Sequence, residues 1–215
     1  MAVPGYNTTM EVETLRRKGL EFEPDLVILG VAGNDLALPN FIQTKRDVLT
    51  LRRSFLWDLV REQMSRRPRG GPEAPRSQLL LSAPRDPRMP QSFESEPGRV
   101  PSRYRDMVGW EALHNALEDL SSLSRQHRFE VILAPLHYSE VGAEAAALGA
   151  DLGFHIVDVG AGVHRYMAEN GIEKLAGSEL AVAPDDAHPS ALRNRLAARQ
   201  IADYMMERGL AGPAP

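Results

Sequence analysis

The residue pattern with the clearest chemical potential is Asp185-Asp186-Ala187-His188-Pro189, just before the last helical pattern of the sequence. A carboxylate three residues before a histidine in a loop can fold back onto Nδ1 of that histidine, which leaves Nε2 facing outward as a base. This is the acid–base half of a serine triad. The spacing predicts His188 as the base and Asp185 as its partner, with Asp186 as a competing partner. In a second interpretation the carboxylate only caps the helix that follows.

Two other segments carry groups that could stabilise a developing negative charge. Gly33, Asn34 and Asp35 directly follow an apolar run, and an asparagine amide at the carboxyl end of a parallel strand can donate to an oxyanion. Residues 3–8 (Val-Pro-Gly-Tyr-Asn-Thr) precede the first helical pattern, and the N–H of Gly5 is open to a ligand because glycine has no side chain. Each segment alone is equally explained as an ordinary turn.

The surrounding elements are predicted to form a parallel sheet covered by helices. Near-continuous apolar runs indicate strands over 25–31, 129–134 and 154–159. Helical patterns cover 8–20, 46–64, 104–126, 139–152 and 161–170, and a last helix begins with Pro189 in its first turn and ends before Gly209. We expect Thr8 and Glu11 to form a capping box at the first helix. Strands that alternate with helices predict a doubly wound α/β fold.

The composition fits one α/β domain over residues 1–215. The chain has 215 residues, of which 43% are hydrophobic, and its formal net charge of -4 gives no reason to expect a nucleic-acid or membrane-surface partner. The absence of cysteine excludes disulfides and thiolate zinc sites, and no apolar run approaches the roughly 20 residues of a membrane helix. Residues 66–104 hold eight of the 16 prolines, which predicts an insertion with little regular structure.

The histidines show no metal-ligand spacing, so we expect neither a metal nor a cofactor. His137 follows the second predicted strand, where a loop could bring it to a substrate.

Taken in order, these segments resemble the SGNH hydrolases, also called GDSL esterases/lipases. The resemblance runs from Val3 to the last helix and implies a three-layer α/β/α, flavodoxin-like sandwich. It also implies that Gly5 and Asn34 are oxyanion-hole donors, that His188 is the catalytic base, and that Asp185 orients it. The activity it implies is hydrolysis of a carboxylic ester on a small molecule, a lipid or an acylated sugar.

The sequence departs from the family pattern in two ways. Ala32 stands where the third block usually has glycine, and we expect the loop to tolerate this small residue. The first block, a strand followed by Gly-Asp-Ser, should precede Gly5, yet no Asp-Ser dipeptide occurs in the sequence. We therefore expect a chain that lacks its nucleophile and is inactive alone. It is either a shortened form of an esterase or an inactive binding or scaffold protein of the same fold.

The same departure has a consequence for the sheet. Loss of the first strand would leave the strand 25–31 at a sheet edge, although its composition is that of a central strand. We therefore expect self-association through that edge. The sequence assigns neither the ester substrate nor a cellular compartment.

Overall fold

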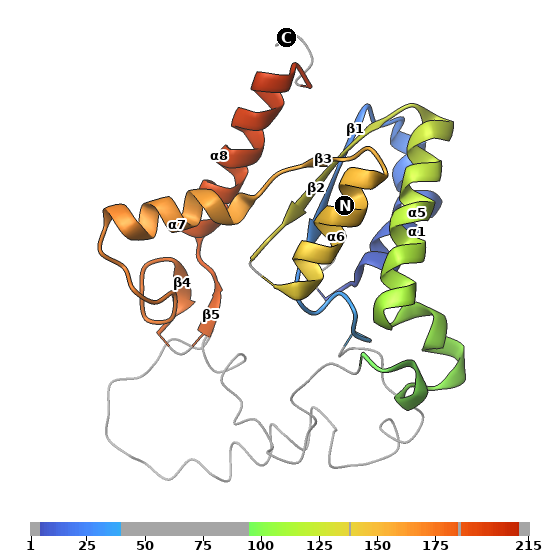
Figure 1. Cartoon of the computed structure of the whole chain (residues 1–215), viewed down its shortest axis with the longest axis horizontal. Helices are drawn as coiled ribbons and strands as arrows, with labels where there is room; N and C mark the ends of the chain where they lie inside the picture. Colours follow the sequence, from blue (N-terminus) through green and yellow to red (C-terminus); the bar gives the residue numbers. More distant parts are fainter. Residues whose placement is uncertain (1–4, 40–94, 138, 185, 211–215) are drawn as a thin grey trace.

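The computed structural model describes residues 5–39, 95–137, 139–184 and 186–210, and its centre is a three-stranded parallel sheet (Figure 1). The strands are β1 (Leu26–Val31), β2 (Glu130–Pro135) and β3 (His155–Ile156), in the order β1-β2-β3. The three predicted strands are confirmed, but β3 is shorter than expected. It ends early because Asp158 leaves the strand and caps the next helix, where its carboxylate accepts the N–H groups of Gly160 and Ala161.

Five α-helices are described. They are α1 (Thr8–Arg17), α5 (Gly109–His127), α6 (Glu140–Asp151), α7 (Val159–Glu169) and α8 (Ala191–Arg208). Short 3₁₀ helices are η1 (Gly19–Phe22), η3 (Pro97–Arg99) and η4 (Ser102–Met107), and a second sheet consists of β4 (Ala181–Ala183) and β5 (Asp186–Pro189). The helices expected from these parts of the sequence are confirmed. The predicted helix 46–64 and most of the proline-rich stretch 66–104 lie outside the described residues.

Two predicted helix starts are wrong by one or two residues. Asn7, not Thr8, caps α1, because its side-chain oxygen accepts the N–H of Met10 at 3.1 Å. Pro189 ends strand β5, and Ser190 caps α8. The predicted end at Gly209 is confirmed, since this residue has the left-handed φ of 66° that favours glycine after a helix.

The apolar core lies on both sides of β2. Val131 and Leu133 belong to a cluster with α1, α5 and α6, whereas Ile132 and Ala134 pack with side chains of α7 and α8. Successive side chains of a strand point to opposite faces, so both faces of β2 are buried and its apolar run is continuous. The described residues therefore form an α/β structure, and none of its described helices is long and apolar enough to cross a membrane.

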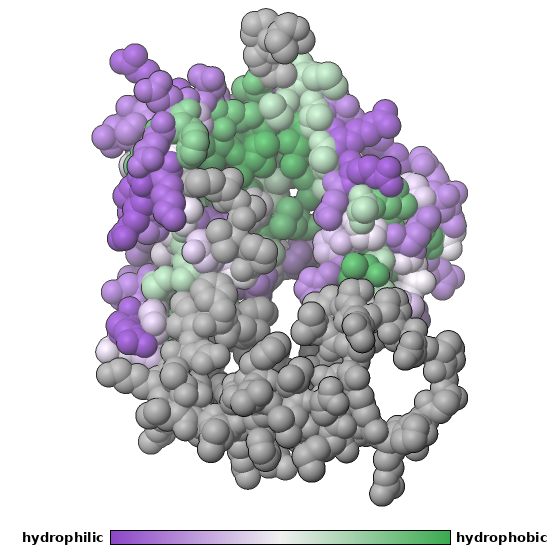
Figure 2. Space-filling model, turned by 180° about the vertical axis from the view of Figure 1, so that it is seen from behind, coloured by the Kyte–Doolittle hydropathy of each residue, from purple (hydrophilic) through white to green (hydrophobic). Residues whose placement is uncertain are grey.

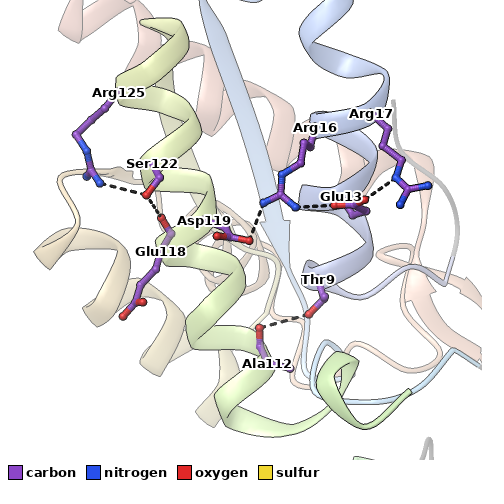
Figure 3. Close-up of polar contacts among 9 residues, drawn as sticks. All are labelled: Thr9, Glu13, Arg16, Arg17, Ala112, Glu118, Asp119, Ser122 and Arg125. Carbon is purple, nitrogen blue, oxygen red and sulfur yellow. Dashed lines mark hydrogen bonds and ion pairs between the residues drawn. The ribbon is translucent and has the colours of Figure 1, made fainter. Parts of the chain in front are cut away.

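Polar contacts join α1 to α5 at the surface (Figure 3). Arg16 of α1 forms ion pairs with Glu13 at 2.6 Å and with Asp119 of α5 at 2.7 Å. Thr9 donates to the carbonyl of Ala112 at 3.3 Å. Exposed ion pairs contribute little stability, so the buried side chains between the two helices supply most of the energy that holds them together. The polar contacts fix the orientation of α1 on α5.

Strand β1 lies at one edge of the described sheet. Its side chain Ile28 is 49% exposed, and Leu26 and Val27 are only partly buried. The view from behind shows an apolar surface with hydrophilic surface on either side (Figure 2). The strand 25–31 thus lies at an edge, as the sequence predicted, within the residues that the structure describes.

Candidate functional site

A cavity of about 490 Å³ opens beyond the carboxyl ends of β1 and β2. It is lined by Gly33, Asn34, Leu36, Ala37, Ser95, His137 and His188. These residues come from the loop after β1, the loop after β2, strand β5 and the segment before η3. The cavity therefore brings together Asn34 and His188, which the sequence singled out separately.

The turn that carries Asn34 is held by the residue next to it. The Asp35 carboxylate accepts the N–H of Ala32 at 2.7 Å, and the N–H of Asp35 donates to the Ala32 carbonyl at 3.1 Å. Asp35 is only 6% exposed, whereas Gly33 and Asn34 are exposed. Aspartate favours such local turns because its side chain pairs with nearby backbone groups. The buried carboxylate thus holds the turn from inside and leaves Asn34 at the cavity.

Two carboxyl groups behind this turn bind protons more tightly than usual. Burial raises the pKa of Asp35 to about 6, although the hydrogen bond from Ala32 opposes the shift. Burial raises the pKa of Glu11 to about 7, and the nearby charge of Asp35 adds to the shift. Both carboxyl groups therefore titrate close to neutral pH.

Asn7 holds the same loop from the side of α1. Its amide donates to the carbonyls of Ala37 at 3.1 Å and Met107 at 2.7 Å, and its oxygen caps α1. The side chain is 2% exposed, so these bonds form in the interior. Sequence reasoning missed this role, although an asparagine just before a helical pattern was a signal for a cap.

His188 lies in β5, which pairs antiparallel with β4. Its Nδ1 is hydrogen-bonded to the carboxylate of Asp186, and its backbone N–H donates to the same carboxylate oxygen at 3.0 Å. The expectation of a loop here is wrong. Residues 186–189 are extended, and residues two apart in a strand lie on the same side, which brings Asp186 to the imidazole. Asp185 lies outside the described residues, so its assignment stays a prediction.

The Asp186–His188 pair is open to solvent. The side chains of Asp186 and His188 are 38% and 80% exposed. Since Nδ1 is taken by the carboxylate, the remaining ring nitrogen, Nε2, is the one that can accept a proton from a bound molecule.

His137 reaches the cavity from the loop after β2. Its Nε2 accepts the N–H of Gly33 at 3.2 Å. The position therefore matches the expectation for this loop, and the contact with a substrate stays a prediction.

Gly5 is exposed, with a φ of 82° in the left-handed region. Gly5 is not one of the described residues that line the cavity. Its role as an oxyanion donor stays a prediction.

Ser95 is the one hydroxyl-bearing side chain in the described lining of the cavity. Sequence reasoning did not single it out, because it lies in the proline-rich stretch without any motif around it. Within the described ranges, no group of three or more His, Asp or Glu side chains could hold a metal ion.

No protein-family model, no curated protein and no solved structure matches this chain. The resemblance drawn from the motifs therefore stays a prediction.

Proposed function

We propose that this chain carries the acid–base and oxyanion-stabilising groups of an SGNH-type ester hydrolase that acts on a carboxylic ester. The observation that supports it best is that Asn34 and His188 line one cavity, although they lie far apart in the sequence. We also propose a three-layer arrangement for the fold. The burial of β2 on both faces suits a three-layer α/β/α, flavodoxin-like sandwich.

In this proposal, His188 is the general base and Asn34 stabilises charge. His188 Nε2 takes the proton of a serine hydroxyl as the serine oxygen bonds to the ester carbonyl carbon. The Asn34 amide donates to the oxyanion that develops on the former carbonyl oxygen. The ester C–O bond then breaks, and His188 returns the proton to the leaving alkoxide. Water, deprotonated by the same imidazole, then attacks the acyl-enzyme, and His188 passes that proton to the serine oxygen as the acid is released.

The carboxylate that orients His188 has two candidates. Asp186 is supported by its contact with Nδ1, and Asp185 by the spacing of the family motif. Either would hold the imidazole in the tautomer that leaves Nε2 free to act as a base.

The alternative is a binding or scaffold protein of the same fold that performs no catalysis. The absence of any Asp-Ser dipeptide from the sequence favours it. Such a protein would use the cavity for a ligand, with Asn34 and His188 as polar contacts.

Hydrolysis of p-nitrophenyl acetate separates the two functions. The unextended chain is expected to be no faster than a variant that combines Asp185→Asn with His188→Ala, because its sequence contains no Gly-Asp-Ser block to supply the serine. An N-terminal extension with a strand and Gly-Asp-Ser should raise the rate by orders of magnitude, since a triad works as a unit. The control is the same extension with its serine changed to alanine.

Two results would decide against the hydrolase. One is an extended chain that folds but hydrolyses no faster than its alanine control. The other is turnover by the extended chain that survives His188→Ala.

A further inference from the structure

We propose that His137 is a positioning residue that holds the Gly33–Asn34 turn in the place where the Asn34 amide can act. The inference rests on the proposed function, in which Asn34 stabilises an oxyanion. Two observations point to His137. One is a hydrogen bond and the other is a steric fit.

The hydrogen bond ties the loops after β1 and β2 together. The Gly33 N–H donates to His137 Nε2 at 3.2 Å, and the adjacent Ala32 N–H donates to the Asp35 carboxylate at 2.7 Å. Two consecutive amides of the turn are therefore held by side chains, one of them buried and the other at the cavity. For Nε2 to accept, the neutral imidazole must carry its proton on Nδ1.

The steric fit concerns the space beside Gly33. A Cβ built on Gly33 would lie 3.0 Å from His137 Nε2 and 3.6 Å from the Cβ of Ser139. The φ of Gly33 is outside the left-handed region, so its backbone conformation does not demand glycine. The close approach of the His137 ring disfavours a larger residue there, because a methyl group at residue 33 would displace the ring.

The placement of this turn matters for Asn34. Asn34 is exposed and directly follows Gly33, the residue that His137 holds. An oxyanion donor must lie within hydrogen-bond distance of one point in space, and small displacements cost rate. The buried Asp35 fixes the base of the turn, and His137 fixes its outer side.

The first experiment follows the Gly33 amide by NMR in His137→Ala and His137→Gln. We expect faster exchange and an upfield shift of the Gly33 proton in His137→Ala, because it loses its acceptor. His137→Gln should restore most of the original signal, since a glutamine oxygen can reach the place of Nε2. The control is His127→Ala at the end of α5, another exposed histidine. A Gly33 amide proton whose exchange rate and chemical shift are the same in both His137 variants as in the unchanged chain would overturn the proposal.

The second experiment combines His137→Ala with Gly33→Ala. Gly33→Ala alone should disturb the Asn34 signals, because its methyl group displaces the ring. In the His137→Ala background the same change should have little further effect, because the obstacle is gone. Coupling of this kind is expected only for residues in contact. Strictly additive effects would contradict the proposal.

The third experiment uses the serine-extended enzyme with p-nitrophenyl acetate. His137→Ala should lower kcat about 3- to 30-fold with little change in KM, which is less than the roughly 100- to 1000-fold typical of removing an oxyanion donor outright. His137→Gln should recover most of the loss. Unchanged kcat in His137→Ala would refute the positioning role, while the hydrolase proposal would stand. If no form turns over ester but the Gly33 amide responds as expected, the contact is supported and the hydrolase proposal fails.

Discussion

Behind the Asn34 turn, Glu11 and Asp35 place two carboxyl groups in an environment that disfavours their charges. The folded state raises the pKa of Asp35 from 3.8 to about 6 and that of Glu11 from 4.5 to about 7, mainly through burial. Because both values are raised, the folded state binds these protons more tightly than the unfolded state does. The stability that these two groups contribute is therefore largest below about pH 4, falls as the pH rises through their two folded pKa values, and is lost above about pH 7.

The expected size of this fall is about 2 kcal/mol for each group, since one unit of pKa corresponds to about 1.4 kcal/mol and partial exposure screens the charges. Urea unfolding between pH 4.5 and 7.5 measures it. Asp35→Asn and Glu11→Gln should each reduce the slope of the free energy of unfolding against pH. The double variant should remove most of that slope. Asp119→Asn, an exposed carboxylate on α5, is the control and should leave the slope unchanged. A slope in all four variants equal to that of the unchanged chain would contradict the assignment.

Also at the residue scale, the structure and the motif name different partners for His188. Because Asp186 contacts Nδ1, Asp186→Asn should shift the Nδ1 proton of His188 upfield, and in the serine-extended enzyme it should lower kcat by about 100-fold or more. Asp185→Asn should have a much smaller effect on both. The measurements are imidazole NMR and esterase kinetics. The reverse order of effects would support the spacing-based prediction of Asp185.

The residues themselves show what the sequence could predict. Asn34 and His188 were predictable because each lies beside a recognisable element boundary. The carboxylate partner of His188 was not predictable, because it depends on the backbone conformation. In an extended backbone the residue two positions away lies beside the histidine, whereas in a turn the residue three positions away can do so. His137 was predictable from its place after the second predicted strand, whereas Ser95 reaches the cavity through the arrangement of distant segments, which no local pattern encodes.

At the scale of elements, Asn7 is the residue that ties the site to the fold. It caps α1 and donates to the loop after β1 and to η4, so one buried side chain connects three elements. Asn7→Ala should cost about 2–4 kcal/mol, because it removes a helix cap and leaves the buried Ala37 carbonyl and the partly buried Met107 carbonyl without this donor. Asn7→Ser should cost about half, since serine retains the cap. The measurement is urea unfolding.

The control for this prediction is Asn170→Ala. Asn170 is exposed at the end of α7 and donates to the Tyr166 carbonyl. Its loss should change stability by less than about 0.5 kcal/mol, as is usual at the surface. Equal losses at the two positions would show that Asn7 acts only as a surface cap.

The elements differ in how well the sequence predicted them. The strands β1 and β2 and the five α-helices follow from apolar runs and helical spacing, which local sequence carries. The pair β4 and β5 was missed because its strands are short and their residues, such as Ala183 and Asp186, show no apolar alternation. Pairing between them depends on the tertiary placement of α7 and α8, and that placement brings His188 to the cavity.

At the scale of the whole molecule, the feature with the largest consequence is the edge of β1 that pairs with no other described strand. Residues 26–31 contain no charge, proline or bulge, which are the features that usually protect an edge strand from pairing. Ile28 is 49% exposed, and none of the residues of α8, which packs nearby, is buried. Within the part of the chain that the structure describes, the outer side of β1 pairs with no other strand, and its apolar side chains suit pairing with the same strand of a second copy.

We therefore expect the chain to self-associate through β1 in a concentration-dependent way. Ile28→Lys should shift the chain toward the monomer, because pairing would bury a charge beside an apolar strand at a cost of several kcal/mol. Val182→Lys is the matched control, since Val182 is also an exposed β-branched residue in a strand, but in the β4–β5 sheet. Size-exclusion chromatography with light scattering gives the mass of each protein. A monomer at all concentrations for the unchanged chain, or equal masses for the two lysine variants, would exclude β1 as the contact. In that case the apolar surface around Ile28 would be covered from within the chain.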